Sequence, residues 1–386
     1  MALSERDLDE LRAAAEHLDR LLLPGQVDEV VARRPVHTAY VPADRFDAGT
    51  VAAWGAAARD AVRDHGPPAG FPASTVDMVL AKLAAEPIED LRVDFEDGYG
   101  YRDTEDQDAL AAGAALRAGA PPFSGLRCKS LEPSTVDRAA RTVDAFLTGL
   151  GPPPPGFVVT FPKATSAAHA DVAVLLCRQL EHAHGLADGT LRFELQVETP
   201  QAVLGADGRS PLPEMIVRSH GRLAGFHYGT YDYSTALGIA PGQQSLEHPV
   251  ADHAKAVMQV AVAGTGVHVS DGSSNVLPVG SPQEVHAAWD LHARLVRRSL
   301  ERGLHQGWDL HPAQLVTRFA ATFQFYLDGL PPARRRLDDY LARRASGVLD
   351  EPATARAIAR FLLRGLHCGA LRRDDLGHPI EDLEAL

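Results

Sequence analysis

The sequence predicts a parallel (β/α)8 barrel, or TIM barrel, with extra N- and C-terminal helices. Eight short runs rich in β-branched and aromatic residues alternate with longer stretches whose apolar residues recur at helical spacing. A strand followed by a helix, repeated eight times, is the pattern of such a barrel. The eight runs cover residues 37–43, 91–99, 125–132, 156–164, 191–200, 222–234, 265–275 and 307–315.

The length of 386 residues allows one large barrel with appendages. We expect a helical extension over residues 1–36, because its opening segment is charged and amphipathic. The barrel should cover residues 37–330, with an insertion at about 47–90 where two successive strand runs lie unusually far apart. Prolines 331 and 332 predict a loop that ends the barrel, because proline cannot continue a helix. A second helical extension would then fill residues 331–386.

Composition excludes several classes of protein. The chain carries 38 basic and 51 acidic residues, a net charge of −13, which disfavours nucleic acid as a partner. The three cysteines lie far apart, so neither a disulfide framework nor a thiolate zinc site is indicated. No run approaches the roughly 20 apolar residues that cross a bilayer, and the N-terminus lacks the apolar centre of a secretion signal. We therefore expect a cytoplasmic protein with no membrane partner.

Polar residues gather where the predicted strands end, and a parallel barrel places its active site at that end. Glu198 and Asp232 should close consecutive strands, which lie about 4.8 Å apart, so that both carboxylates can share one cation. Hard oxygen ligands favour Mg²⁺ or Mn²⁺ over zinc. The alternative is that each carboxylate caps a helix or pairs with an arginine.

Arg127 and Lys129 alternate with Cys128 on the third predicted strand and therefore share a face. If that face is the barrel interior, both charges need anionic partners: a substrate carboxylate, or a structural ion pair with Asp94 or Glu96.

Lys163 ends the fourth run, where it could act as a structural counter-ion or, if desolvated, as a Schiff-base nucleophile. Asp97 should occupy the last extended position before Gly98, with the neighbouring Glu96 facing the other way. The sequence does not decide which of the two carboxylates faces the site.

Other polar residues at the strand ends have open roles. His227 could supply a proton, His311 could ligate, shuttle a proton or fix a loop, and Asp271 has no assigned role. The glycines of GADGR (205–209) and PVGSP (278–282) are too few for a dinucleotide fingerprint or a phosphate loop, so we expect no nucleotide cofactor.

Six short motifs, in order and in register, resemble the superfamily of the citrate lyase beta subunit and the HpcH/HpaI aldolases, with malyl-CoA and citramalyl-CoA lyases as relatives. They are VDFEDGY, LRCKS, FPKA, QVETPQAV, GTYDYS and GWDLHPAQL, spread over residues 37–320. The chain departs from the pattern at Tyr231, where the lyases usually have an acidic residue, in its enlarged first inter-strand segment, and in its seventh-strand region.

The resemblance implies a barrel of the phosphoenolpyruvate/pyruvate type and a set of site residues. Glu198 and Asp232 would bind Mg²⁺ (or Mn²⁺), and Arg127 would hold a carboxylate or enolate oxygen of the substrate. Glu96 and Asp97 would support this shell, and Lys163 would lie near it. The substrate-binding positions predicted from the motifs are Arg127, Lys129, Thr199, Gly229 and Thr230.

Three functional hypotheses follow. The first is a Mg²⁺-dependent carbon–carbon lyase or aldolase that acts through an enolate on a small 2-oxo or hydroxy acid, free or as a coenzyme A thioester. The second keeps the enolate in a malate-synthase-like condensation or in phosphoryl chemistry on phosphoenolpyruvate. The third is a non-catalytic barrel that binds a metabolite. The resemblance and the long C-terminal helices also suggest a homo-oligomer, a trimer or hexamer.

Overall fold

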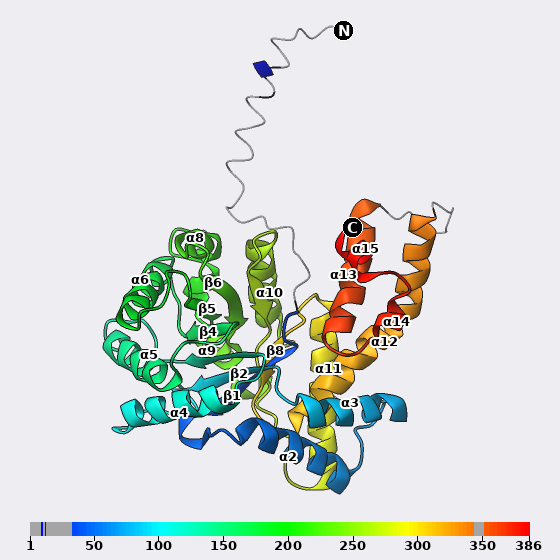
Figure 1. Ribbon diagram of the computed structural model, residues 1–386, viewed down its shortest axis with the longest axis horizontal. Coiled ribbons are helices and arrows are strands. Elements are labelled where there is room, and N and C mark those ends of the chain that lie inside the picture. Colours follow the sequence, from blue (N-terminus) through cyan, green and yellow to red (C-terminus); the bar gives the residue numbers. More distant parts are fainter. Residues whose placement is uncertain (1–8, 11, 13–32, 343–350) are drawn as a thin grey trace.

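The computed structural model describes residues 9–10, 12, 33–342 and 351–386 (Figure 1). Nearly all of the predicted N-terminal helical extension therefore lies outside the described residues. Within the described part of the chain, no helix combines the length and the apolar character that crossing a bilayer demands.

Eight parallel strands form a nearly closed barrel, as the sequence predicted. From β1 to β7 each strand pairs with the next one in the chain, and β1 also pairs with β8. Between β7 and β8 the described residues contribute one isolated bridge, Ser273 to Trp308, in place of a ladder. The strands are β1 (His37–Pro42), β2 (Asp90–Asp94), β3 (Phe123–Arg127), β4 (Phe157–Phe161), β5 (Arg192–Val197), β6 (Leu223–Tyr228), β7 (His268–Ser270) and β8 (Gly307–Asp309).

Helices surround the barrel because each crossover between parallel strands returns along its outside. In Val136–Leu150, for example, the buried face of the helix carries Val143, Phe146, Leu147 and Leu150. The helices are α2 (Thr50–His65), α3 (Ala73–Ala85), α4 (Glu105–Gly119), α5 (Val136–Leu150), α6 (Ala168–Ala183), α7 (Pro200–Val203), α8 (Leu212–Arg218), α9 (Thr230–Ala236), α10 (Pro249–Val262), α11 (Pro282–Glu301), α12 (Gln314–Leu341), α13 (Pro352–His367), α14 (Arg373–Leu376) and α15 (Ile380–Glu384), with short 3-10 turns at Ala43–Arg45 and Pro241–Gln243.

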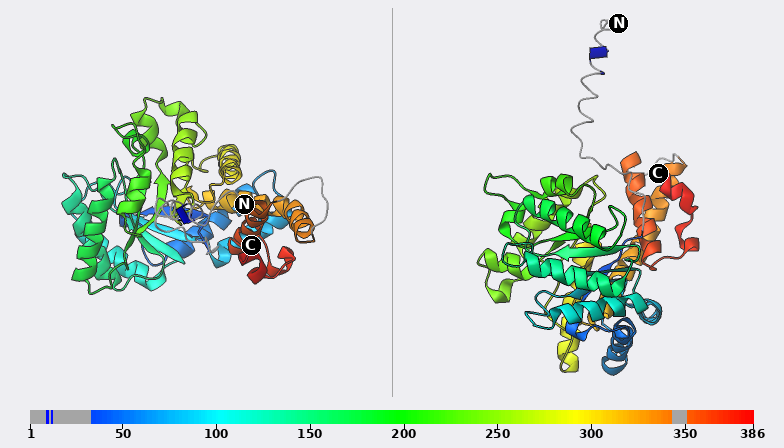
Figure 2. Two further views of the ribbon diagram at one scale, coloured as in Figure 1. Left: turned by 90° about the horizontal axis from the view of Figure 1, so that it is seen from above. Right: turned by 60° about the vertical axis from the view of Figure 1, so that its left-hand side comes forward.

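The long segment between β1 and β2 holds α2 and α3. Both helices pack against α12, and α2 also contacts α11. The C-terminal helices α13 to α15 gather on one side of the barrel, beyond α12 (Figures 1 and 2).

The predicted loop at Pro331 and Pro332 is wrong, because both prolines lie inside α12, which continues to Leu341. The two prolines are exposed, so their rings meet solvent. Beside them α12 is fixed by tertiary packing: a Cβ on Gly329 would come within 2.4 Å of the Phe361 ring of α13. This close helix contact outweighs the unfavourable helix propensity of proline.

The interior of the barrel is polar, and its charges are paired. Arg92 of β2 donates to Glu194 of the non-adjacent strand β5 at 2.8 Å and also pairs with Asp90. Thr160 of β4 donates to the same Glu194 carboxylate at 3.1 Å. The contact between β2 and β5, which are not adjacent, is possible only across the barrel interior. Opposite charges are matched there, as burial requires.

Candidate active site at the carboxyl ends of the strands

The polar residues predicted at the strand ends lie on the carboxyl side of the barrel, but few of them are in the strands themselves. Asp94 and Arg127 are the last residues of β2 and β3, and Glu198 follows β5 directly. Lys163 follows β4 by two residues, in the left-handed region with φ 58°.

Arg127 is held by a bidentate ion pair with Asp94. Its Nε and one terminal nitrogen donate to the two carboxylate oxygens at 2.7 and 2.8 Å. The guanidinium carbon lies 4.9 Å from the ring centre of Tyr40 and 6.0 Å from that of Trp308, within the range of cation–π contacts. The other terminal nitrogen lies 3.4 Å from Glu96. Asp94 and two aromatic rings thus fix the orientation of Arg127 and leave one nitrogen directed toward Glu96.

Glu96 and Lys163 form an ion pair close to Arg127. Burial lowers the pKa of Lys163, but the hydrogen bond and the charge of Glu96 outweigh burial and raise this pKa above its ordinary value. The amine therefore remains protonated. A protonated amine is not a nucleophile, so the geometry favours the counter-ion role over the Schiff base.

Asp97 does not occupy the last extended position of a strand. β2 ends at Asp94, and residues 96–99 form a bend and turn that leave the Asp97 side chain 63% exposed. The turn forms because Asp94 accepts hydrogen bonds from the backbone N–H groups of Glu96 and Gly98, both at 3.0 Å. Of the two carboxylates that the sequence left undecided, the buried Glu96 faces Arg127, and Asp97 lies at the rim, 3.9 Å from Arg127.

Glu198 is a buried carboxylate that makes no ion pair among the described residues. It is 5% exposed and accepts a hydrogen bond of 2.7 Å from the backbone N–H of Lys163. Burial raises the pKa of Glu198 to about 8; the charge of Arg127 lowers it, and the charges of Asp232 and Glu96 raise it further. A carboxylate with so high a pKa binds a proton or a cation readily at neutral pH.

Asp232 lies in the first turn of α9, one turn beyond β6, so the expectation that it closes a strand beside Glu198 is wrong. β6 ends at Tyr228, and the helix begins at Thr230, which exposes Asp232 to solvent. Its charge nevertheless acts on Glu198. A buried and a solvent-facing carboxylate are hard oxygen donors that fit Mg²⁺ or Mn²⁺, with water or substrate oxygens completing the coordination.

Three further predicted binding positions contact the surrounding loops. Lys129 donates to the backbone carbonyls of Phe95 and Gly100, so it fastens the turn after β2. Thr199 caps α7 and donates to the carbonyl of Ala164 at 2.7 Å, and Thr230 donates to the carbonyl of Ser273 at 3.2 Å.

Gly229 borders Glu198 directly. A Cβ at this position would lie 2.6 Å from the Glu198 Oε2 atom. The structure thus places Arg127, Glu96, Lys163, Glu198 and Gly229 together, and it places Lys129 on the adjoining loop.

One group of potential metal ligands lies inside the barrel: Glu194, His227 and His268. Each offers one ligand atom, and the three atoms lie within 4.8 Å of one another. Among the described residues this is the one group of three or more histidine, cysteine or acidic side chains that could hold a metal ion. Nδ1 of His227 accepts a 2.8 Å hydrogen bond from the Trp308 indole, which can only donate. The neutral ring therefore carries its proton on Nε2, which faces Glu194 at 3.1 Å. A metal would have to displace that proton and compete with Arg92 for Glu194, so we interpret the group as a hydrogen-bonded cluster.

The other residues with open roles have structural contacts. Asp271 pairs with Lys255 at 3.0 Å and accepts a hydrogen bond from Ser299. Nδ1 of His311 accepts a 3.2 Å hydrogen bond from the Ala313 N–H, just before α12.

Tyr40 and Trp308 are site residues that the sequence analysis missed. Both contact Arg127, and their rings lie 4.6 Å apart. Tyr40 follows Ala39 and Trp308 follows Gly307, in otherwise ordinary strands. The available signal was the period of two, which places Tyr40 on the same face of its strand as Thr38.

A family model described as a domain of unknown function, DUF6986, matches residues 12–385. The chain belongs to this family. A search of curated proteins finds no significant sequence match for it.

Solved structures with the same fold include members of two enzyme groups. The Haloferax volcanii malate synthase in its magnesium and glyoxylate complex is 17% identical, with 83% of this chain and 79% of that chain covered and a TM-score of 0.54. The same enzyme in its pyruvate and acetyl-CoA complex is 17% identical over 91% of this chain and 80% of that one, with a TM-score of 0.54. CitE from Mycobacterium tuberculosis in complex with magnesium, acetoacetate and coenzyme A is 18% identical over 88% of this chain and 99% of that one, with a TM-score of 0.52.

These likenesses confirm, at the level of the fold, the resemblance to the citrate lyase beta superfamily. They show that the DUF6986 chain shares its barrel with these enzymes.

Proposed function

We propose that this DUF6986 chain is a Mg²⁺-dependent carbon–carbon lyase or aldolase that acts through an enolate on a small 2-oxo or hydroxy acid. The observation that carries the proposal is Glu198, a buried carboxylate with a pKa of about 8 that lies within the electrostatic reach of Arg127 and Asp232. Structural neighbours in complexes with magnesium make that ion the first to test.

Glu198 and Asp232 would hold the cation. When bound, the ion would supply Lewis acidity to a carboxylate and an adjacent oxygen of the substrate. Its positive charge would also compensate Glu198, which otherwise favours the protonated form at neutral pH.

Arg127 would stabilise the negative charge that develops on the substrate oxygen. Asp94 occupies two of its nitrogens and the rings of Tyr40 and Trp308 restrict its rotation, so the third nitrogen needs little reorganisation to donate. Preorganised donors of this kind typically contribute about 3 to 4 kcal/mol to transition-state stabilisation. Lys163 would keep Glu96 ionised and in place beside Arg127. Asp97, at the exposed rim, would place a second carboxylate beside Arg127, in addition to Glu96.

Proton exchange in deuterated buffer tests the enolate step without knowledge of the true substrate. We expect the methyl signal of pyruvate in the proton NMR spectrum to decay in the presence of the full-length chain and Mg²⁺, and to persist with chelator. Glu198→Gln should abolish the exchange, and Glu381→Gln, a substitution of an exposed glutamate in α15, should not. Exchange that survives both the chelator and Glu198→Gln would refute the proposal.

A condensation is the second candidate, favoured by the likeness to malate synthase. It would use the same cation and the same Arg127, with the enolate formed from an acyl thioester. Incubation with glyoxylate and acetyl-CoA, followed by assay of free coenzyme A, separates the two reactions.

A further inference from the structure

The residues that follow β7 close the barrel between β7 and β8. The backbone N–H of Trp308 in β8 donates to the Gly272 carbonyl at 3.1 Å, and Ser273 forms the isolated bridge to the same strand. We call residues 271–275 the seam segment, because they stand where an isolated bridge replaces a ladder. The seam segment therefore holds β8, whose Trp308 ring lies 6.0 Å from the guanidinium carbon of Arg127.

The first turn of α9 is tied to the seam segment by two side chains. The Thr230 hydroxyl donates to the Ser273 carbonyl at 3.2 Å. The Tyr231 hydroxyl accepts a hydrogen bond of 2.5 Å from the Asn275 N–H and donates to the Ser273 carbonyl at 3.4 Å. The two segments also pack closely, because a Cβ on Gly272 would overlap the Thr230 Oγ1 atom.

The position of Asp232 depends on this anchoring. Its side chain is exposed and makes no hydrogen bond or ion pair with the residues that the structure describes. The helix that carries it has only seven residues, and Gly229 at the N-cap has no side chain to cap it. A helix this short is marginal by itself, so contacts outside it must fix its first turn. Thr230 and Tyr231 provide such contacts.

Tyr231 is the residue of the GTYDYS motif at which this chain departs from the lyases. Burial raises the pKa of Tyr231, so the hydroxyl is neutral at physiological pH. A neutral phenol adds no negative charge for a cation. Its hydrogen bonds to the seam segment are therefore what this side chain contributes beside the candidate site.

We propose that Tyr231 is a positioning residue: its hydroxyl fixes the first turn of α9 to the seam segment and thereby holds Asp232 where it can share a cation with Glu198. The inference rests on the proposed function, because it takes Glu198 and Asp232 as the cation ligands. The same seam segment supports β8, whose Trp308 packs on Arg127. One segment thus supports both the acidic side of the site and its arginine.

Calorimetric titration of the full-length chain with Mg²⁺ tests the proposal. Tyr231→Phe keeps the ring and removes the hydroxyl, so we expect the Mg²⁺ affinity to fall about threefold to tenfold, the range that one net hydrogen bond contributes. Tyr233→Phe is the matched control in the same helix. Its hydroxyl makes no hydrogen bond within the described part of the chain, so its removal should leave the affinity unchanged.

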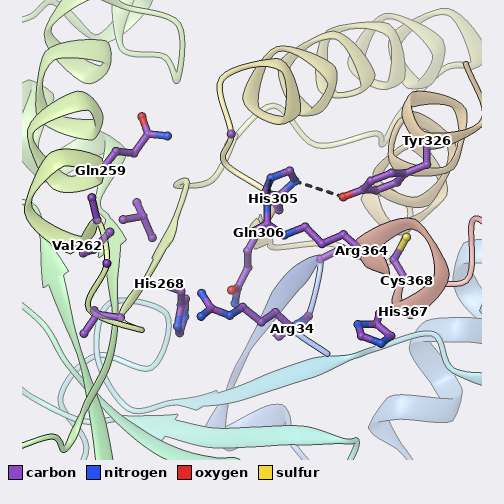
Figure 3. A pocket seen from close by; sticks show the side chains of 17 residues that line it. Arg34, Gln259, Val262, His268, His305, Gln306, Tyr326, Arg364, His367 and Cys368 are labelled. Atoms are coloured by element: carbon purple, nitrogen blue, oxygen red, sulfur yellow. Dashed lines mark hydrogen bonds between the residues drawn. The ribbon is translucent and has the colours of Figure 1, made fainter. Parts of the chain in front are cut away.

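A second control separates positioning from the loss of any tyrosine hydrogen bond. The Tyr326 hydroxyl lies 3.3 Å from Nδ1 of His305, beside a cavity at the amino ends of the strands (Figure 3). Glu198 and Asp232 lie at the opposite end of the barrel. Tyr326→Phe should therefore leave the Mg²⁺ affinity unchanged, whatever its effect on the free energy of unfolding in urea.

A double-mutant cycle shows whether Tyr231 acts through Asp232. Asp232→Asn removes the charge but keeps an oxygen donor, so Mg²⁺ binding should be weaker but measurable. Adding Tyr231→Phe to this variant should weaken the binding little further, because the residue that Tyr231 positions is already impaired. A hydroxyl that acts only on the fold would lower the affinity by the same factor in both backgrounds.

Two results would overturn the positioning role and leave the proposed lyase site intact. One is an unchanged Mg²⁺ affinity in Tyr231→Phe when the unaltered protein binds Mg²⁺. The other is a loss of affinity from Tyr231→Phe that is as large in the Asp232→Asn background as in the unaltered protein. Absence of Mg²⁺ binding in the unaltered protein would instead refute the proposed cation site, and the positioning role with it.

Discussion

Glu198 shows how a single residue can link burial, charge and a candidate function. A carboxylate that is 5% exposed, without an ion-pair partner in the described structure, keeps its proton well above the pH at which an exposed glutamate loses it. The folded protein without metal therefore binds a proton at Glu198 that the unfolded chain releases.

This difference predicts a decline in stability as the pH rises. Because the folded pKa of Glu198 is about 8 and the reference value is 4.5, ionisation in the folded state costs free energy throughout that interval. In the presence of chelator, we compare the free energy of unfolding of Glu198→Gln with that of the unaltered protein. The difference, in favour of the variant, should grow by roughly 3 kcal/mol from about pH 5.5 to about pH 8.5. Urea unfolding at the two pH values measures the change. Glu381→Gln is the exposed control, and equal pH dependence in both variants would contradict the assignment.

At the scale of elements, Gly229 joins β6 to α9 and brings the backbone against Glu198. A Cβ there would lie 2.4 Å from the Cβ of Glu198 and 2.6 Å from its Oε2 atom. We expect Gly229→Ala to displace the Glu198 carboxylate, to destabilise the fold by about 1 to 3 kcal/mol and to weaken Mg²⁺ binding. Urea unfolding and calorimetric titration with Mg²⁺ measure the two effects.

Gly242→Ala, in the 3-10 turn Pro241–Gln243, is the matched control, because its Cβ would meet nothing within 4 Å. Unchanged Mg²⁺ affinity in Gly229→Ala would show that the contact does not position Glu198.

The period of hydrophobic residues located all eight strands but not their ends. β2 and β6 are wholly buried, so their apolar runs stand out in the sequence, yet each run continues past its strand into polar segments that fold back over the barrel mouth. Asp97 and Asp232 were assigned to strands for this reason. Side-chain acceptors decide where such strands end: Asp94 binds the N–H groups of the following turn, a contact that no pattern of hydrophobicity encodes.

Pro331 and Pro332 are a second case in which a rule based on local sequence fails. Proline predicts the end of a helix, but α12 continues through both residues. Proline removes a backbone hydrogen bond and costs up to about 3 kcal/mol in a helix interior. Both side chains are exposed, so replacement loses little packing. We expect Pro331→Ala/Pro332→Ala to raise the free energy of unfolding by about 1 to 2 kcal/mol, less than the full helix penalty because alanine also frees the unfolded chain.

Chemical denaturation measures this gain. Pro282→Ala is the control, because Pro282 opens α11 after the Ser281 cap, where proline is favourable. A gain at Pro282 as large as at Pro331 and Pro332 would show that the gain does not come from relieving the interior of α12.

For the molecule as a whole, buried and half-buried histidines oppose the effect of Glu198 on the acid side. Burial lowers the pKa values of His37, His268, His292 and His305, so the unfolded chain takes up protons below about pH 6.5 that the folded protein does not. Stability should therefore fall as the pH drops below that value. For His305, with a pKa of about 3, the loss amounts to about 1.4 kcal/mol per pH unit. His305→Gln should flatten the acid limb by about this slope, and the exposed His253→Gln should not.

The two effects have opposite signs, so the metal-free protein should be most stable near about pH 6.5, between the histidine and Glu198 titrations. Saturating Mg²⁺ should remove the alkaline decline, because a cation bound at Glu198 replaces the proton and stabilises only the folded state. Urea unfolding from about pH 5 to 9, with Mg²⁺ and with chelator, should give two curves that agree in acid and separate above about pH 7. Curves that coincide throughout would mean that Glu198 binds no cation, whatever activity the chain shows.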